Sequence, residues 1–324
     1  MAAGGGEGKA ARSMSQNKTT KKSAGAQAPR VYEYESYRRL DELLALRSLA
    51  PATMEEYRRY VRKLGLRVQR DPAGLEEHEV REYLLRLKTH QHYSPSSMRG
   101  ACAALRFYYG HVLGRDWKLF DLVRTPTVQH LPQVLSREEV GRLFGVLREP
   151  RFRVLLRLIY ACGLRVGEAV RLEVRDVQAG CRLHLRQTKG NKERYVPLPG
   201  AMLEELRQWW KLHRHPRLLF PGVGRGWKEH RRGVVAGTDE PMSISSVQHC
   251  FRQAVTEARL PREATVHTLR HSYATHLLEA GVSLRLISAY LGHTSLDTTV
   301  IYTHLTAVSE EKARAVVEGL LPAV

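Results

Sequence analysis

The sequence predicts a mainly α-helical protein with a small antiparallel β-sheet, built as a helical first domain and an α+β second domain. Apolar residues recur at helical spacing through residues 31–125. A hairpin pattern surrounds Gly190-Asn191 within a C-terminal half that is otherwise helical. A stretch with two prolines and no clear period, residues 126–135, separates the halves as an interdomain linker would.

The composition points to a polyanionic partner. The 324 residues are compatible with two domains, and a hydrophobic content of 43% is enough to build their cores. Lysine and arginine number 52 against 33 aspartate and glutamate, which gives a net charge of +19. Such an excess favours binding to nucleic acid, although a basic protein without a specific partner remains the alternative.

Residues 1–30 predict a disordered basic tail. They are mostly Gly, Ala, Ser, Lys and Gln, with too few large apolar groups to offset the chain entropy of folding. The tail is either simply solvated or makes weak, non-specific contacts with DNA.

Cysteine usage and hydropathy indicate a cytoplasmic protein. Cys102, Cys162, Cys181 and Cys250 are scattered without a paired spacing, which is typical of a reduced intracellular chain. No run of about 18 apolar residues predicts a membrane span, and the N-terminus has no apolar signal core. We therefore expect no membrane partner.

Residues 31–125 predict a bundle of four helices. Leu40–Leu46 mark the first, and the second begins at Pro51, since proline is favoured in the first turn of a helix. Val80–Leu87 mark the third, and the fourth runs from Ser94 to Gly114. Arginines enrich the outer faces, and in so basic a chain we expect them to contact phosphates. These candidate DNA-binding residues are Arg58, Arg62, Arg99 and Arg106.

Residues 136–324 predict the α+β domain. Ser136 and Glu139 form a capping-box pattern at its first helix, and a buried helix at 152–162 ends at Gly163. Two short strands lie within 173–198, and residues 221–241 are expected to be a glycine-rich basic loop. Further helices are predicted at 200–213, 244–258, 267–279, 284–291 and 309–319.

Four motifs within this domain carry chemistry-bearing residues in a fixed order. They read ACGLRVGEAVRL at 161–172, QTKGNKERYVPL at 187–198, HTLRHSYATHLLEAG at 267–281 and LGHTSLDTTVIYTH at 291–304. Together they resemble the motifs of the tyrosine recombinase (phage integrase) family, and the resemblance covers most of residues 35–310. It implies a SAM-like helical core-binding domain at 31–125 and the catalytic domain at 136–324.

Two of these motifs supply a phosphate clamp by resemblance. Arg165 matches the first arginine of the family's clamp and Arg270 the second; arginine keeps its charge and binds phosphate bidentately. Glu168 matches the acid that supports the first arginine, as a buried arginine requires. Without the motifs, Arg165 would be interpreted as a solvated turn residue and Glu168 as a first-turn acid.

The hairpin turn carries the general acid that the resemblance implies. Lys189 matches the family's lysine that enters the DNA and protonates the leaving 5′ oxygen, and a flexible amine suits that reach. Lys192 lies on the same turn and is the competing candidate, and it is otherwise expected to bind DNA. Two solvated turn lysines remain the alternative.

His267 and Arg270 are three residues apart, so they project from one face of a helix N-terminus. Free backbone N–H groups at that end favour a phosphate. By resemblance His267 handles protons or donates a hydrogen bond. His267 and His271 also have the spacing of a metal pair, but no third ligand lies nearby in the sequence and Arg270 would repel a cation, so no metal is expected.

The last motif contains the implied nucleophile. His293 follows Gly292 at a helix end, and in the family this histidine donates to the scissile phosphate. Tyr302 follows nine residues later and matches the tyrosine that attacks the phosphodiester. Other tyrosines, such as Tyr160, Tyr273 and Tyr290, lie in apolar helical patterns and are expected in the core.

The resemblance implies a site-specific DNA recombinase that needs neither metal nor cofactor. Strands would be cut through a 3′-phosphotyrosine and exchanged through a Holliday junction by a homo-tetramer on double-stranded recombination sites, with a partner recombinase as an option. The apolar face of the helix at 309–319 would dock in cis or in trans. A bacterial, nucleoid-associated location follows. We expect no arm-binding domain before the helical one, which favours Xer-like, integron-like or transposon-associated enzymes over lambda-type integrases. Among these, the motif at 277–306 slightly favours a mobile-element recombinase.

Two other functions remain open on the sequence. A type IB topoisomerase uses similar chemistry but relaxes supercoils as a monomer. A DNA-binding protein that has lost catalysis is disfavoured because all six catalytic positions are occupied. Replacing Tyr302 with phenylalanine separates a binding protein from both enzymes.

Overall fold

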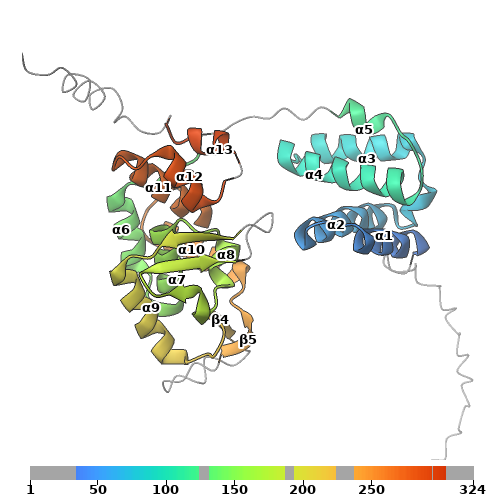
Figure 1. Cartoon of the computed structure of the whole chain (residues 1–324). Helices are drawn as coiled ribbons and strands as arrows, with labels where there is room; N and C mark the ends of the chain where they lie inside the picture. Colours follow the sequence, from blue (N-terminus) through green and yellow to red (C-terminus); the bar gives the residue numbers. More distant parts are fainter. Residues whose placement is uncertain (1–33, 124–130, 187–192, 224–236, 294, 304–324) are drawn as a thin grey trace, which may run out of the picture. The chain divides into compact units, whose positions relative to one another are not determined.

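The computed structural model describes residues 34–123, 131–186, 193–223, 237–293 and 295–303 (Figure 1). The chain divides into two compact units, with the boundary between residues 128 and 129. The expected tail at 1–30, the helix at 309–319 and the turn residues Lys189 and Lys192 lie outside the described residues.

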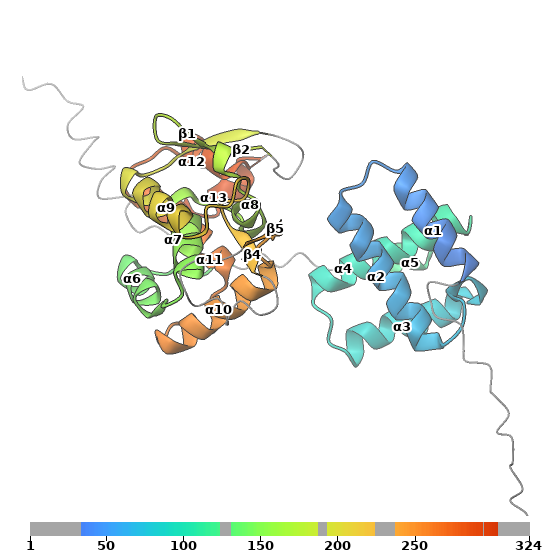
Figure 2. The same ribbon diagram turned by 90° about the horizontal axis from the view of Figure 1, so that it is seen from below.

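The first unit is helical, as predicted. Helix α2 lies beside α4, and α1 and α3 pack against this pair (Figures 1 and 2). Leu40, Leu64 and Leu105 are fully buried between these helices. The elements are α1 (Glu35–Leu46), α2 (Pro51–Val68), η2 (Pro72–Gly74), α3 (Glu77–Thr89), α4 (Pro95–Arg106), η3 (Phe107–Val112) and α5 (Leu119–Leu122).

The predicted fourth helix is two elements. Helix α4 ends at Arg106, and the chain continues as a π-helical stretch, η3, to Val112. The wider turn accommodates the consecutive buried rings of Tyr108 and Tyr109, whose centroids lie 5.0 Å apart edge to face. Gly114 then ends the segment with a φ of +68°, which favours glycine.

The second unit places helices around two small antiparallel sheets. Its buried helix α7 contacts both α9 and α11, and Figure 2 shows α7 in the middle of the unit. The helices are α6 (Arg137–Val146), α7 (Pro150–Cys162), α8 (Val166–Val170), η4 (Val174–Asp176), α9 (Gly200–His213), α10 (Ile244–Glu257), α11 (Val266–Glu279), α12 (Leu284–Leu291) and α13 (Asp297–Val300). The predicted capping box at Ser136 and Glu139 is confirmed.

The sheets confirm one prediction and correct another. Strands β1 (Val177–Gln178), β2 (Arg182–Leu185) and β3 (Arg194–Pro197) form an antiparallel sheet in that order, with Leu185 opposite Arg194. The prediction of a loop at 221–241 is wrong at both ends of that range, which are strands. There, β4 (Pro221–Val223) pairs with β5 (Gly237–Pro241), because the flanking Phe220 and Met242 are buried and Met242 N–H donates to the Phe220 carbonyl at 3.0 Å.

The expected linker also ends too late. Leu135 was assigned to it, but its side chain is fully buried in the core of the second unit. Its backbone N–H donates to Ser272 Oγ of α11 at 2.9 Å. Burial of a leucine and of its amide partner ties the last residue of this segment to the second unit.

Two helix ends meet beside α11 in the second unit. Helix α7 ends at Gly163 and α12 ends at Gly292, both with positive φ, and both ends lie against α11. A Cβ on Gly163 would lie 2.4 Å from the ring of Tyr273 on α11. Glycine is therefore needed at this position twice, for its φ of +62° and for the close approach of the tyrosine.

Substituting Gly163 with alanine should lower the free energy of unfolding by about 2–4 kcal/mol, since it combines a left-handed backbone with an overpacked contact. The measurement is urea unfolding followed by tryptophan fluorescence. Gly141→Ala is the matched control, because Gly141 lies inside α6 with no heavy atom within 4 Å of an added Cβ. The control should be neutral or stabilising by up to about 1 kcal/mol. Equal effects of the two substitutions would contradict the argument.

Candidate active site

The described site residues of the motifs gather around the N-terminal half of α11. Arg165 is the N-cap of α8, directly after the end of α7. His267 and Arg270 lie on α11. His293 follows α12, and Tyr302 follows α13. Their charges act on one another: both Arg165 and Arg270 affect the pKa values of His267, His293 and Tyr302.

Arg270 is the buried centre of this group. Its side chain is only 1% exposed. Its guanidinium donates to the carbonyl of Gly163 at 2.7 Å and to the carbonyl of Leu291 at 2.6 Å. These are orphan carbonyls at the ends of α7 and α12, where the helix dipole is negative. Burial, and then the charge of Arg165, lower the pKa of Arg270 to about 9, so it remains a cation at neutral pH.

Glu168 binds Arg165, and it also binds a second arginine. Arg165 donates to it through its backbone N–H at 2.9 Å and through its guanidinium at 2.8 Å. Arg194 of β3 donates to both carboxylate oxygens, at 3.1 and 2.8 Å. Burial alone would raise the pKa of Glu168, but the hydrogen bonds and charges of Arg194 and Arg165 outweigh it and lower the pKa to about 2.

Sequence reasoning did not include Arg194 among the site residues. It lies in the quoted motif at 187–198, but two neighbouring lysines drew attention to the turn. The strand pattern held the signal, because Arg194 and Val196 alternate inward in β3. A half-buried arginine on the same face as a buried valine requires an acidic partner.

His267 lies exposed at the start of α11, with its ring edge to face against His271 at a centroid distance of 4.5 Å. Loss of hydration, and then the charges of Arg270 and Arg165, lower its pKa. The expected free N–H groups at this helix end are partly used, because a capping box between Thr265 and Thr268 binds one of them.

His293 follows Gly292, whose φ of +64° turns the chain sharply out of α12. Its Nδ1 is 2.8 Å from Thr299 Oγ1, which orients the ring. Burial, with the charges of Arg270 and Arg165, lowers the pKa of His293 to about 4. The ring is therefore neutral at physiological pH.

Tyr302 is buried, with 1% of its surface exposed. Its hydroxyl lies 2.9 Å from Nδ1 of His271, which sequence reasoning treated only as a packing or hydrogen-bonding residue. Burial raises the pKa of Tyr302, and the charges of Arg270 and Arg165 oppose that rise. Burial lowers the pKa of His271 to about 4, so a neutral imidazole faces the phenol.

The candidate DNA-binding arginines of the first unit differ in their surroundings. Arg58 donates to Asp41 at 2.6 Å and Arg62 to the Tyr37 hydroxyl at 3.3 Å, on one face of α2. Arg106 pairs with Asp121 at 2.7 Å. Arg99 on α4 is exposed.

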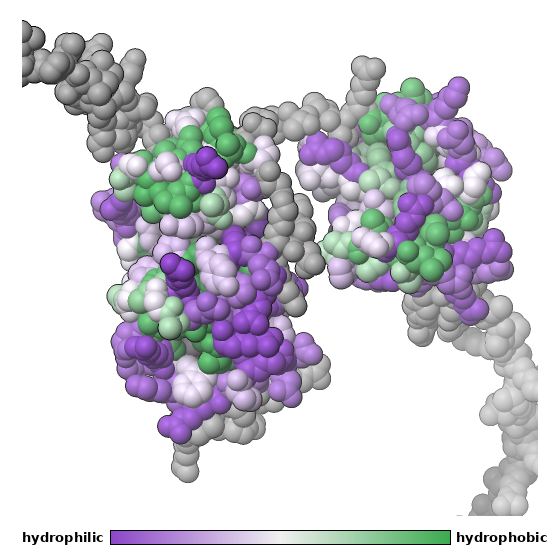
Figure 3. Space-filling view, viewed as in Figure 1, coloured by the Kyte–Doolittle hydropathy of each residue, from purple (hydrophilic) through white to green (hydrophobic). Residues whose placement is uncertain are grey.

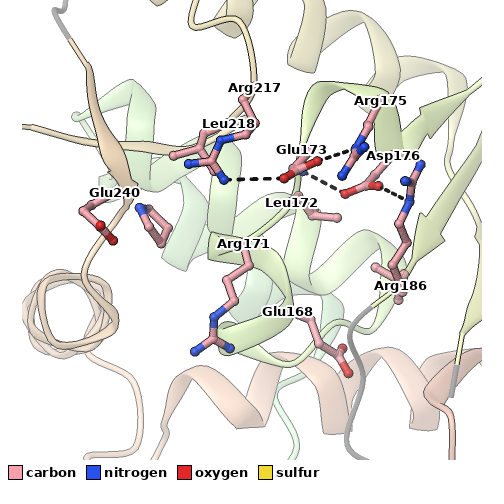
Figure 4. Close-up of a pocket in the computed structure, with 12 residues that line it drawn as sticks. Glu168, Arg171, Leu172, Glu173, Arg175, Asp176, Arg186, Arg217, Leu218 and Glu240 are labelled. Carbon is pink, nitrogen blue, oxygen red and sulfur yellow. Dashed lines mark hydrogen bonds and ion pairs between the residues drawn. The ribbon is translucent and has the colours of Figure 1, made fainter. Parts of the chain in front are cut away.

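Beside α8 lies a cavity of about 330 Å³ lined by arginines and acids. Figure 4 shows Arg217, Glu173, Asp176 and Arg186 joined in a chain of polar contacts, with Glu168 set apart from it. Hydrophilic side chains dominate the surface around α8, β4 and β5 (Figure 3). Arg217 and Arg175 pair with Glu173, and Arg186 pairs with Asp176.

The described residues contain no group of three histidine, cysteine, aspartate or glutamate side chains arranged to hold a metal ion. No helix among them has both the length and the apolar character needed to cross a membrane.

Comparison with known families matches both units. Residues 133–308 match the phage integrase family, and residues 37–119 match the N-terminal SAM-like domain of phage integrases. The chain is 33% identical to the tyrosine recombinase XerA of Thermococcus kodakarensis over 287 residues, 88% of this chain and 93% of the relative. It is 33% identical to an integrase/recombinase of Escherichia coli, covering 82% of this chain and 86% of that protein.

Solved structures show the same fold. A lambda integrase dimer bound to a core site is similar with a TM-score of 0.62 at 19% identity, covering 82% of this chain and 93% of that chain. The Tn1549 transposon integrase in complex with transposon right-end DNA is similar with a TM-score of 0.61 at 16% identity, covering 87% and 98% of the two chains.

The carboxylate of Glu168 should make stability depend on pH in a defined window. Because its folded pKa of about 2 lies below the ordinary value of 4.5, its contribution is present above about pH 4.5 and is lost as pH falls toward 2. The size of the pH-dependent part is about 3 kcal/mol. Urea unfolding of wild type and Glu168→Gln across this range isolates it, since other carboxylates cancel in the difference. A difference that does not shrink in acid would contradict the assignment.

Tyr302 should resist nitration by tetranitromethane, which attacks the phenolate. Burial removes access and the raised pKa removes the phenolate. Tyr195, half exposed on β3, is the control within the same unit. Peptide mass spectrometry of the DNA-free protein should find Tyr195 modified well before Tyr302. Equal rates would show that the tyrosine is not held against His271.

Proposed function

The chain belongs to the phage integrase family of tyrosine recombinases, enzymes that cut and rejoin DNA in site-specific recombination, and from this premise we propose that Tyr302 is its nucleophile. The observation that carries the proposal is the position of the Tyr302 hydroxyl beside a neutral histidine and within the field of Arg165 and Arg270. A phenol in such a field is stabilised as its proton leaves.

The proposed reaction exchanges one phosphodiester for another. The Tyr302 oxygen attacks the phosphorus, the bond to the 5′ oxygen breaks, and a 3′-phosphotyrosine forms. Arg165, Arg270, His267 and His293 stabilise the charge that builds on the phosphate oxygens. A 5′-hydroxyl from another strand then reverses the step, so strands exchange through a Holliday junction without an external energy source.

Protons need a donor and an acceptor in this scheme. With its proton on Nε2, His271 can accept from the Tyr302 hydroxyl through Nδ1. Lys189 protonates the leaving 5′ oxygen in our proposal, and Lys192 is the alternative. The Tyr302 side chain is 1% exposed, so its oxygen has to become accessible for the attack.

Double-stranded DNA is the proposed partner, bound by both the helical unit and the catalytic unit. Exposed Arg99 is available for a phosphate contact, while Arg58, Arg62 and Arg106 would exchange their present partners for phosphates. Exchange of two duplexes requires four nucleophiles, so we propose a homo-tetramer on DNA. We further propose a mobile element as substrate and the bacterial nucleoid as the location.

Covalent capture tests the nucleophile. Wild type and Tyr302→Phe are expressed in bacteria, the lysates are denatured, and DNA that stays attached to the protein is sequenced. Wild type should give adducts at a common short motif, and Tyr302→Phe should give none, since the attacking oxygen is gone. Tyr195→Phe is the matched control on an exposed tyrosine of the same unit and should behave as wild type.

The pattern of adducts separates the other functions. Adducts scattered over unrelated sequence, together with relaxation of supercoiled plasmid, would favour a topoisomerase. Adducts that persist in Tyr302→Phe would remove Tyr302 as nucleophile. If wild type gives no adduct even with candidate flanking DNA added, a DNA-binding protein without catalysis is the better interpretation.

A further inference from the structure

We infer that Arg194 is a positioning residue of the proposed active site, which couples the β2–β3 hairpin both to Glu168 on α8 and to the end of α12. The inference rests on the proposed function, because it describes how that same site is held together. Arg194 would contact no reacting atom. It would act through Arg165 and His293.

The first contact joins β3 to α8. Arg194 donates from both terminal nitrogens to both oxygens of Glu168, and the two side chains are 9% and 7% exposed. A bidentate, buried pair of this kind fixes the rotation of the carboxylate. Since Glu168 binds Arg165 through that same carboxylate, the clamp arginine depends on Arg194 for its position.

The second contact joins β3 to the end of α12. Arg194 Nε donates to the carbonyl of Tyr290 at 2.8 Å. The same side chain lies against Gly292, where an added Cβ would approach Cδ to 2.9 Å and Nε to 3.1 Å. Gly292 directly precedes His293, so the guanidinium supports the turn that presents this histidine.

The shape of arginine is required for this arrangement. One guanidinium serves three acceptors in different directions, the two oxygens of Glu168 and the Tyr290 carbonyl. Lysine carries the same charge on a single flexible amine and cannot bind all three in this fork. In Arg194→Lys, the lysine charge should keep Glu168 ionised, but the hydrogen bond to the Tyr290 carbonyl of α12 should be lost.

The position of Arg194 in the sheet shows which part of the fold it connects to the site. Arg194 is the first residue of β3 and lies opposite Leu185, the last residue of β2, so it stands at the base of the hairpin. Lys189 and Lys192 belong to the connecting segment at this base. Arg194 therefore links the base of this hairpin to Arg165 through Glu168, and to the turn before His293 through the Tyr290 carbonyl.

The test removes Arg194 and follows Glu168 and cleavage separately. The charged groups that act on Glu168 are Arg165 of α8, Arg194 of β3, and His267 and Arg270 of α11. In Arg194→Met the largest opposing interaction is lost and burial dominates, so the pKa of Glu168 should rise. Carbon-13 NMR of glutamate-labelled full-length protein, assigned with Glu168→Gln, measures this from about pH 8 to about pH 4 without DNA.

Cleavage is measured as the yield of covalent adduct on the DNA sites recovered with wild type. Arg194→Met should form adducts on the order of 10-fold to 100-fold more slowly. The rate of Arg194→Met should also fall further as pH is lowered, because the Glu168 carboxylate is ionised only above its raised pKa. The rate of wild type should show no such fall over the same pH range. Glu168→Gln combined with Arg194→Met should be slow at every pH, since no carboxylate remains to titrate.

Arg157→Met is the matched control, because Arg157 also donates to a glutamate, Glu205 at 2.8 Å, but away from the site. It should leave rate and pH profile unchanged. If Arg194→Met does not fold, Arg194→Lys is tested in its place. Arg194→Lys should form adducts more slowly than wild type, but its rate should not fall further at low pH.

Two results would overturn the inference. One is that Arg194→Met forms adducts at the wild-type rate and with the wild-type pH dependence, or that Arg194→Lys does so if it is tested in its place. The other is an unaltered titration of Glu168 in Arg194→Met. Absence of adducts in wild type would instead reject the proposed function, while the NMR titration would still decide whether Arg194 governs Glu168.

Discussion

A single buried carboxylate, Glu168, holds the cations of this site together. Arg165 and Arg194 both bind it, and its charge also stabilises the buried Arg270, whose neighbours Arg165 and Arg194 repel it. Three guanidinium groups brought this close would destabilise the fold without an opposing charge. The carboxylate stays ionised because the same arginines lower its pKa to about 2. A phosphate can therefore be received by cations that are already in place.

Helix ends supply the second half of the arrangement. Arg270 binds carbonyls at the ends of α7 and α12, two helices far apart in the chain. Each carbonyl lacks a partner within its own helix, so the guanidinium both satisfies them and is fixed by them. The position of the Arg270 guanidinium and the packing of α7, α11 and α12 are thus one constraint. Loss of either would disturb the other.

The proposed nucleophile, Tyr302, is kept apart from solvent. Tyr302 is buried against His271, although an attack on phosphate requires an accessible oxygen. Burial raises the pKa of the phenol and lowers that of the histidine, so both are neutral at rest. A neutral phenol is a weaker nucleophile than a phenolate, so the proposed attack requires Tyr302 to become exposed and to lose its proton.

The helical spacing of apolar residues in the sequence determined most of the helices. Capping residues such as Ser136 and Gly163 marked helix ends, because a cap depends only on residues close to it in the chain. Ordered motifs also identified the family and nominated Arg165, Glu168, Arg270 and Tyr302. Only the tertiary structure brought Arg194 to Glu168 and His271 to Tyr302, paired β4 with β5, and buried Leu135. Arg194 lies 26 residues from Glu168 in the chain, and Tyr302 lies 31 residues from His271. Such contacts depend on how helices and strands pack, and no local pattern in the chain records them.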